Sequence, residues 1–279
     1  MKTHTRHTRT TRVTTTTALL ILLVLACGAL AAPAKRTATH GGVRITFDVT
    51  LAREATGQTF PAAPLEQESD KPDGVYPEHV AFTLVGMRDA PTDSFQEPVV
   101  RICPVAEYLK AFSVSPRHVR EAERTLNELR RLIRRKPAAL RGNVPMLPFP
   151  DATEVFHTHV KYLRFQGGSG VAFLTQSQQD DSLINAQQVS YEFRGLTDDG
   201  RYYVSATFPV GAPVLAPTPD AATHEGYALL LHRGGRREQQ QYAAYVERVR
   251  RKLERLPSEQ FTPSLRLYEE LLSSIEIRK

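Results

Sequence analysis

Hydrophobic and polar residues alternate over several short segments of the chain, which predicts the strands of a β-sheet. The alternation is strictest at 189–194 and 202–208, on either side of the turn-forming sequence from Leu196 to Gly200. Because the side chains of a strand point alternately to its two faces, these segments form a hairpin that buries Tyr202 and leaves Tyr203 outside. Further strands are expected at 43–49, 80–85, 99–105, 156–165 and 171–175.

Apolar residues recur every three or four positions in three other segments, as they do in amphipathic helices. The first begins at Ser115-Pro116 and stops before Pro137. Its Ser oxygen is expected to accept a backbone N–H, and Pro suits the first helical position. The second helix extends from Tyr242 to Leu256, and the third follows Thr262-Pro263 and includes Leu265 to Ile275.

Strands mixed with helices predict an α+β fold in which one antiparallel β-sheet with hairpins packs against about three helices. Residues 35–279 are expected to form a single domain that opens with a short polar linker at 35–42. Residues 52–77 are rich in Pro, Gly, Asp and Glu without any period, which predicts a long surface loop.

The first 34 residues have the pattern of an export signal. A cationic, acid-free segment precedes a continuously apolar run that is shorter than the ~20 residues of a membrane span. Small residues near Ala32 suit cleavage by signal peptidase, which predicts a secreted protein. Residues 24–28 also resemble the lipobox of bacterial lipoproteins, in which Cys27 would become the lipidated first residue. An uncleaved N-terminal anchor is the third alternative.

Composition and charge exclude several classes of protein. The chain has 279 residues, of which 41% are hydrophobic and 24% charged, so it is long and apolar enough to bury a core. Its formal charge of +6 includes four basic residues of the signal. Without them, 32 basic residues face 30 acidic ones, which is not the footprint of a dedicated nucleic-acid binder. Cys103, the only cysteine besides Cys27, is expected to be a buried, inert thiol.

The outer face of the helix at 115–136 is rich in arginine. It carries Arg117, Arg120, Arg124, Arg130, Arg131, Arg134 and Arg135 against Glu121, Glu123 and Glu128. Such a face is commonly a solvated surface with Glu–Arg pairs within the helix. The alternative is a docking site for an acidic protein partner or an anionic envelope surface, with Arg117, Arg120, Arg124, Arg131 and Arg135 as its candidate residues.

His157 and His159 are the candidate metal ligands. In a regular strand, side chains two positions apart lie on one face about 7 Å apart, so both imidazoles could contact one ion. A stable site needs a third or fourth ligand, which Asp151, Glu154, His118 or His224 could supply, but no spacing specifies one. Two partly exposed polar residues of an edge strand are the simpler interpretation.

Other polar motifs are explained by turns. Residues 166–170 form a glycine-rich turn that lacks both the Gly of a nucleophile elbow and the Lys of a phosphate loop. Asp180-Asp181 and Asp198-Asp199 are likewise interpreted as turn residues rather than calcium or acid–base carboxylates. No cofactor is predicted.

Two blocks carry a resemblance to a known family. Residues 162–176 and 191–206, the second containing Gly195-Leu196-Thr197-Asp198-Asp199-Gly200 followed by Tyr202-Tyr203, together with Pro209-Val210, resemble an uncharacterised family of exported bacterial proteins. The resemblance implies export and fold, but no activity or cofactor. The order of strands, hairpins and a closing helix is also similar to the PsbP-like α/β/α sandwich, which implies a binding or assembly role.

Two functions follow from these observations. The first is an exported or lipid-anchored, non-catalytic protein that binds a partner or assembles at the cell envelope, touching the membrane only through its signal or lipid anchor. The second is an exported hydrolase or metal-dependent enzyme that uses His157 and His159. Neither the ligand nor the partner follows from the sequence.

Overall fold

A computed structural model describes residues 34–67, 69, 71–179, 182–219 and 235–278. Their contacts group Pro33–Lys279 as one compact unit. Residues 1–33 of the predicted signal, including Cys27, and also Asp180, Asp181 and His224, lie outside the described residues. No helix in the described ranges is long and apolar enough to cross a membrane.

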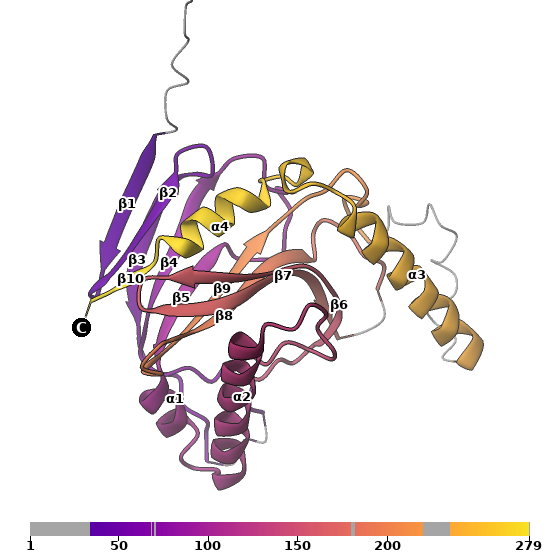
Figure 1. Cartoon of the computed structure of the whole chain (residues 1–279). Coiled ribbons are helices and arrows are strands. Elements are labelled where there is room, and N and C mark those ends of the chain that lie inside the picture. The colour runs from indigo at the N-terminus through magenta and orange to yellow at the C-terminus, as the bar shows by residue number, and fades with distance from the viewer. Residues whose placement is uncertain (1–33, 68, 70, 180–181, 220–234, 279) are drawn as a thin grey trace, which may run out of the picture. The chain divides into compact units, whose positions relative to one another are not determined.

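The described chain contains two antiparallel sheets and four α-helices, which confirms the α+β class (Figure 1). The large sheet has the order β3-β4-β5-β9-β8-β7-β6, and the small one the order β1-β2-β10. The strands are β1 (Lys35–His40), β2 (Val43–Asp48), β3 (Ala52–Phe60), β4 (His79–Met87), β5 (Val99–Pro104), β6 (Thr153–Phe165), β7 (Gly168–Gln178), β8 (Val189–Thr197), β9 (Tyr202–Pro209) and β10 (Glu276–Ile277). The helices are α1 (Val105–Ala111), α2 (Pro116–Arg135), α3 (Arg236–Glu254) and α4 (Leu265–Ser273), with a 3₁₀ turn at Ser258–Gln260.

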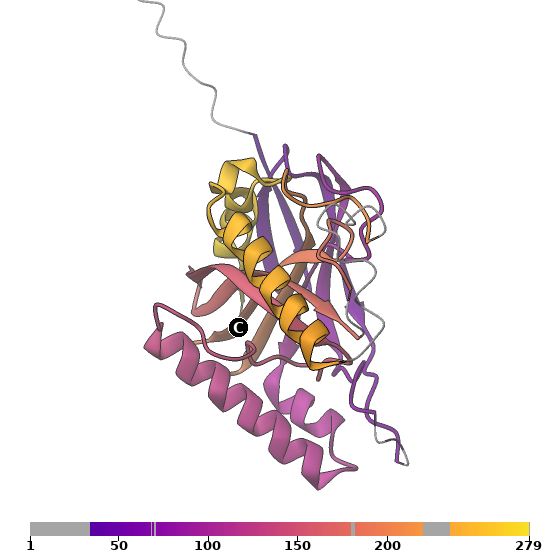
Figure 2. The ribbon, with the colours of Figure 1, turned by 90° about the vertical axis from the view of Figure 1, so that its right-hand side faces the viewer.

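Helices cover both faces of the large sheet. On β7, Ala172 and Leu174 belong to a core shared with α3, α4 and the small sheet, whereas Val171 and Phe173 belong to a second core shared with α1 and α2. Figures 1 and 2 show α1 and α2 on one side of the sheet and α4 on the other. The side chains of β7 therefore alternate between two cores, and not between a core and solvent.

This arrangement corrects the expected orientation of the central hairpin. Tyr203 is 1% exposed and belongs to the core with α1 and α2, while Tyr202 is half-buried. The ring of Tyr203 contacts Tyr108 of α1 edge-on, and the hydroxyl of Tyr203 accepts the N–H of Leu147. The prediction that Tyr203 points outward was wrong because α1 was not expected from the sequence.

The predicted loop at 52–77 is also corrected. Residues 52–60 form β3, an edge strand whose eight residue pairs with β4 extend from Ala52↔Met87 to Phe60↔His79. Most of its side chains are exposed, so the strand carries no alternation of apolar residues. Residues 35–40, predicted to be a polar linker, form β1, which pairs along its whole length with β2.

The glycine-rich turn is shorter than predicted. Only Gln166 and Gly167 connect β6 and β7, and Gly167 has a φ of 75°, which suits glycine. Gly168 and Gly170 already belong to β7, where the rings of Phe165 and Phe193 occupy the space of a β-carbon. These glycines therefore serve close packing of aromatic rings on the sheet.

The helix termini agree only in part with the expected caps. Ser115 precedes α2, but its side chain makes no capping hydrogen bond, contrary to the prediction. The helix is held by buried Ala122, Leu126, Leu129 and Ile133 and ends at Lys136, whose backbone is left-handed. At α4 the cap is Ser264, which accepts the N–H of Arg266, and not Thr262-Pro263.

Candidate functional site

Five exposed arginines of α2 lie along one side of the helix. At 100° per residue, Arg117, Arg120, Arg124, Arg131 and Arg135 fall within an arc of roughly 60°. All five are exposed. Since each residue adds 1.5 Å, the stripe extends over about 27 Å of the helix. We call these five residues the arginine stripe.

The stripe is not neutralised by its own helix. Within α2, which the structure describes in full, no basic residue forms an ion pair; Arg130 donates a hydrogen bond of 2.7 Å to Asn127. On α3, by contrast, Glu247 pairs with Arg250 at 2.8 Å and with Arg251 at 3.0 Å. The expected Glu–Arg pairs of a solvated face are therefore present on α3 and absent from α2.

The spacing of charges explains this difference. A Glu is best placed for pairing when a basic residue follows it by four positions. Glu121, Glu123 and Glu128 are followed at that spacing by Thr125, Asn127 and Leu132, so none of them has such a partner. Glu247 of α3 has Arg251 there. Arg124 and Arg131 do follow Glu121 and Glu128 by three positions, the spacing of the Glu247–Arg250 pair, but α2 carries seven arginines against three glutamates, so its positive charge exceeds what such pairs could neutralise.

A pocket of about 460 Å³ lies where the stripe ends. We call it the arginine pocket. Arg131 and Arg135 of the stripe and Arg141 of the following segment line it, and Glu128 is its one acidic lining residue. The rest of the lining is mainly apolar: Leu132, Pro137, Ala139, Leu140, Val144 and Pro145. The arginine pocket therefore combines apolar walls with a positive rim.

Side chains of the large sheet hold the outer wall of the arginine pocket in place. The N–H of Val144 donates to Glu154 of β6 at 3.4 Å, and its carbonyl accepts from Arg194 of β8 at 2.6 Å. Arg194 is 3% exposed, lies over the ring of Phe173 at 5.0 Å and pairs with Glu192. Sequence analysis missed this ion pair, because charged residues at 192 and 194 were expected on a solvated face.

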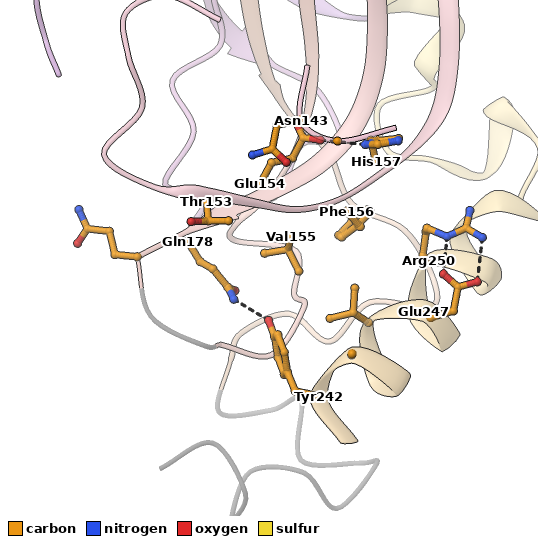
Figure 3. Close-up of a pocket in the computed structure, with 14 residues that line it drawn as sticks. Asn143, Thr153, Glu154, Val155, Phe156, His157, Gln178, Tyr242, Glu247 and Arg250 are labelled. Carbon is orange, nitrogen blue, oxygen red and sulfur yellow. Dashed lines mark hydrogen bonds and ion pairs between the residues drawn. The ribbon is translucent and has the colours of Figure 1, made fainter. Parts of the chain in front are cut away.

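A second pocket, of about 560 Å³, lies between the start of β6 and α3 (Figure 3). Its charged groups are paired with one another, as are Gln178 and Tyr242. His157 pairs with Glu154 at 2.9 Å, Arg250 with Glu247, and Gln178 donates to Tyr242 at 2.6 Å (Figure 3). The charged groups that line this pocket are therefore paired within the protein, unlike Arg131 and Arg135 of the arginine pocket.

His157 has an altered acidity. Its hydrogen bond to Glu154 raises the pKa of the imidazole, while partial burial opposes that effect. Its Nδ1 faces Glu154, and its Nε2 lies 3.4 Å from the carbonyl oxygen of Leu140. The imidazole thus connects β6 to the segment that walls the arginine pocket.

The structure does not bring His157 and His159 together as a metal site. A bulge follows Thr158, and His159 has a φ of 50°, so its ring leaves the regular strand pattern. Nε2 of His159 lies 2.8 Å from the carbonyl oxygen of Leu253 on α3, and its ring contacts Phe261. Among the residues described, no three His, Cys, Asp or Glu side chains are grouped to hold a metal ion.

The other candidates occupy structural positions. Cys103 is fully buried, and burial raises the pKa of its thiol to about 12, as expected for an inert cysteine. Asp198 pairs with Arg164 at 3.4 Å and Asp199 with Arg201 at 3.8 Å, both in the turn between β8 and β9. His118 lies in the core between Phe112 and Phe149.

No protein family, curated protein or solved structure matches the chain. The resemblances to an exported bacterial family and to PsbP-like domains therefore stay predictions.

Proposed function

We propose that this protein is an exported or lipid-anchored, non-catalytic protein of the cell envelope that binds an acidic protein partner through the arginine stripe. The observation that carries the proposal is the excess positive charge of α2, in which seven arginines stand against three glutamates. Five exposed arginines lie on one face without an ion pair within their own helix. Burying these arginines in an interface without carboxylates would be unfavourable. Carboxylates of a partner would pair with them through charge-assisted hydrogen bonds.

The residue types favour recognition of carboxylates. Arginine presents a rigid fork of donors that matches a carboxylate with two hydrogen bonds, which lysine cannot do. The stripe consists of arginine only. Clustered arginines also accelerate the encounter with an acidic partner by electrostatic steering.

Acidic residues beside the stripe favour a protein over a lipid surface. Glu121 and Glu128 follow Arg117 and Arg124 by four positions, so they flank the stripe on one side. A uniformly anionic membrane would repel both carboxylates. A protein surface can place carboxylates against the arginines and a basic or neutral group against Glu121 and Glu128.

The test measures binding to defined probes. The mature protein is titrated with a labelled oligoglutamate peptide and with vesicles of phosphatidylglycerol. The stripe variant, in which Arg117, Arg120 and Arg124 are changed to Glu, is expected to bind the peptide at least about ten-fold more weakly, equivalent to ~1.4 kcal/mol.

The matched control reverses three exposed arginines elsewhere, Arg88, Arg237 and Arg255, with the same change in net charge. This variant should retain most of the affinity of the wild type. Equal loss in both variants would show a response to net charge only, and wild-type binding by the stripe variant would refute the docking site. Binding to vesicles but not to peptide would favour the anionic envelope surface.

The second candidate is an exported hydrolase or metal-dependent enzyme that uses His157 without His159, whose ring contacts Leu253 and Phe261 instead. The observation in its favour is the pairing of His157 with Glu154 at the edge of a 560 Å³ pocket, since a carboxylate–imidazole pair suits acid–base chemistry. Metal analysis of the purified mature protein tests it. A stoichiometric ion that is lost in His157→Ala would support this candidate over the first.

A further inference from the structure

We infer that the arginine pocket holds an apolar side chain of the acidic partner segment, so that the partner presents a hydrophobic residue flanked by carboxylates. This inference rests on the proposed function and deepens it. The arginine stripe and the pocket share Arg131 and Arg135, which places the pocket at one end of the proposed docking surface.

The composition of the pocket calls for a ligand with two properties. Its lining contains three arginines and one glutamate, together with leucine, proline, valine and alanine side chains. Exposed ion pairs alone contribute little to affinity in water, so a free carboxylate or phosphate would bind weakly here. An apolar side chain removes the walls from water, and carboxylates beside it then meet the guanidinium groups at the rim.

The size of the pocket suits a side chain of the partner. Its volume of about 460 Å³ is that of a site for a whole small ligand, so it has room for one large apolar side chain together with the neighbouring atoms of the partner segment. Leu132 of α2 and Leu140 of the following segment both line the pocket and are half-buried. Both side chains therefore remain partly accessible for hydrophobic contact with a ligand.

The outer wall of the arginine pocket, formed by Leu140 and Val144, is already fixed before a partner binds. Leu140 and Val144 are tied to the large sheet through His157, Glu154 and Arg194. The hydroxyl of Tyr162 donates to the carbonyl of Pro137 at 3.2 Å, at the beginning of the same segment. A site that is held in shape loses little conformational entropy on binding, which favours affinity.

The test compares peptides of equal charge. Three acidic peptides differ only in their central residue, which is Leu, Phe or Ser, and their binding to the mature protein is measured by fluorescence anisotropy. The Leu or Phe peptide is expected to bind at least about ten-fold more tightly than the Ser peptide, or ~1.4 kcal/mol.

Two variants locate the apolar contact. Leu140→Ser weakens one wall, and Ala139→Trp fills the pocket from an exposed position without removing any apolar group. Each should abolish the preference for the apolar peptide while leaving the Ser peptide bound as before. If Leu140→Ser fails to fold, Ala139→Trp still decides the question. Val246→Ser, in the neighbouring pocket, is the matched control and should keep the preference.

The outcomes separate the two proposals. Equal binding of all three peptides, weakened equally by the stripe variant, would refute the apolar anchor and retain the docking surface. Absence of salt-sensitive peptide binding would refute both. Binding of phosphatidylglycerol vesicles that is lost in Ala139→Trp, without peptide binding, would assign the pocket to a lipid and overturn the inference.

Discussion

His157 and Glu154 form an ion pair on β6, with Nδ1 of the imidazole 2.9 Å from Oε1 of the carboxylate. The remaining polar atoms of both residues contact the segment from Leu140 to Val144. Nε2 of His157 faces the carbonyl of Leu140, and Oε2 of Glu154 accepts the N–H of Val144. A neutral imidazole has one N–H, so only the imidazolium donates to Glu154 and to Leu140 together. The charge of His157 therefore stabilises the wall of the arginine pocket.

The first prediction concerns the pH dependence of stability. The pKa of His157 is raised in the folded protein. Its contribution is therefore fully present below the unfolded pKa of about 6.5 and is lost as the pH rises through the folded pKa. We expect the free energy of unfolding of the wild type to exceed that of His157→Gln by about 1 kcal/mol at acidic pH, and by less at alkaline pH. Urea unfolding at several pH values measures the difference.

The matched control for this prediction is Glu154→Gln, which keeps the shape of the side chain and removes its charge. The difference in the free energy of unfolding between Glu154→Gln and the wild type should also become smaller as the pH rises, because this variant breaks the same pair. A constant difference between the wild type and His157→Gln at every pH would contradict the role of the imidazolium.

The second prediction concerns the buried pair of Arg194 and Glu192. Arg194→Met leaves Glu192 buried without its partner and frees the carbonyl of Val144. We expect a loss of about 3 kcal/mol in the free energy of unfolding, since breaking a buried pair leaves an uncompensated charge. The double variant Arg194→Met with Glu192→Leu should recover part of this loss in urea titrations. A double variant less stable than the single one would be inconsistent with a desolvated carboxylate as the cause.

The third prediction concerns the glycines of β7. A β-carbon at Gly170 would overlap the ring of Phe193 and approach the carbonyl of Arg194. Gly170→Ala should therefore destabilise the protein by about 1–3 kcal/mol, as overpacking does in a filled core. Ser169→Ala, one residue away and half-buried, is the matched control and should change the midpoint of thermal unfolding much less. Equal midpoints for the two variants would contradict the packing of the ring on Gly170.

The fourth prediction concerns the N-terminus. Intact-mass measurement of the protein purified from its own host should show a mature chain that begins between Cys27 and Lys35. A start at Cys27 with an acyl mass that disappears in Cys27→Ser would identify a lipoprotein, and a start near Ala32 would identify a secreted protein. A chain that retains Met1 would contradict both the lipoprotein and the secreted protein, and of the three alternatives only the uncleaved N-terminal anchor would fit.

Local patterns in the sequence determine several elements of this fold correctly. The helical spacing of Ala122, Leu126, Leu129 and Ile133 predicts α2, and the alternation on both sides of the turn at 198–200 predicts the hairpin of β8 and β9. The α+β class follows from these elements. The exposure of the arginine stripe also follows from the sequence, because its residues lie opposite the apolar face of one helix.

The two-sided burial of the sheet depends on contacts between distant segments. Alternation shows that Tyr202 and Tyr203 face opposite ways, but not that α1 and α2 cover the second face and bury Tyr203 more deeply. The same covering turns Arg194 and Glu192 into a buried pair. A strand such as β3, with exposed side chains on both faces, is specified by its pairing with β4 and carries little local signal.

The contacts of His157 and His159 likewise depend on segments that are distant in the sequence. The spacing of the two histidines predicts a shared face in a regular strand, but a bulge and contacts to α3 direct His159 to Leu253, while His157 pairs with Glu154. Hydrophobic periodicity is a local property that follows from the geometry of a single helix or strand. Which charges become paired, which tyrosine is buried and where a pocket opens depend on segments that meet only when the chain folds.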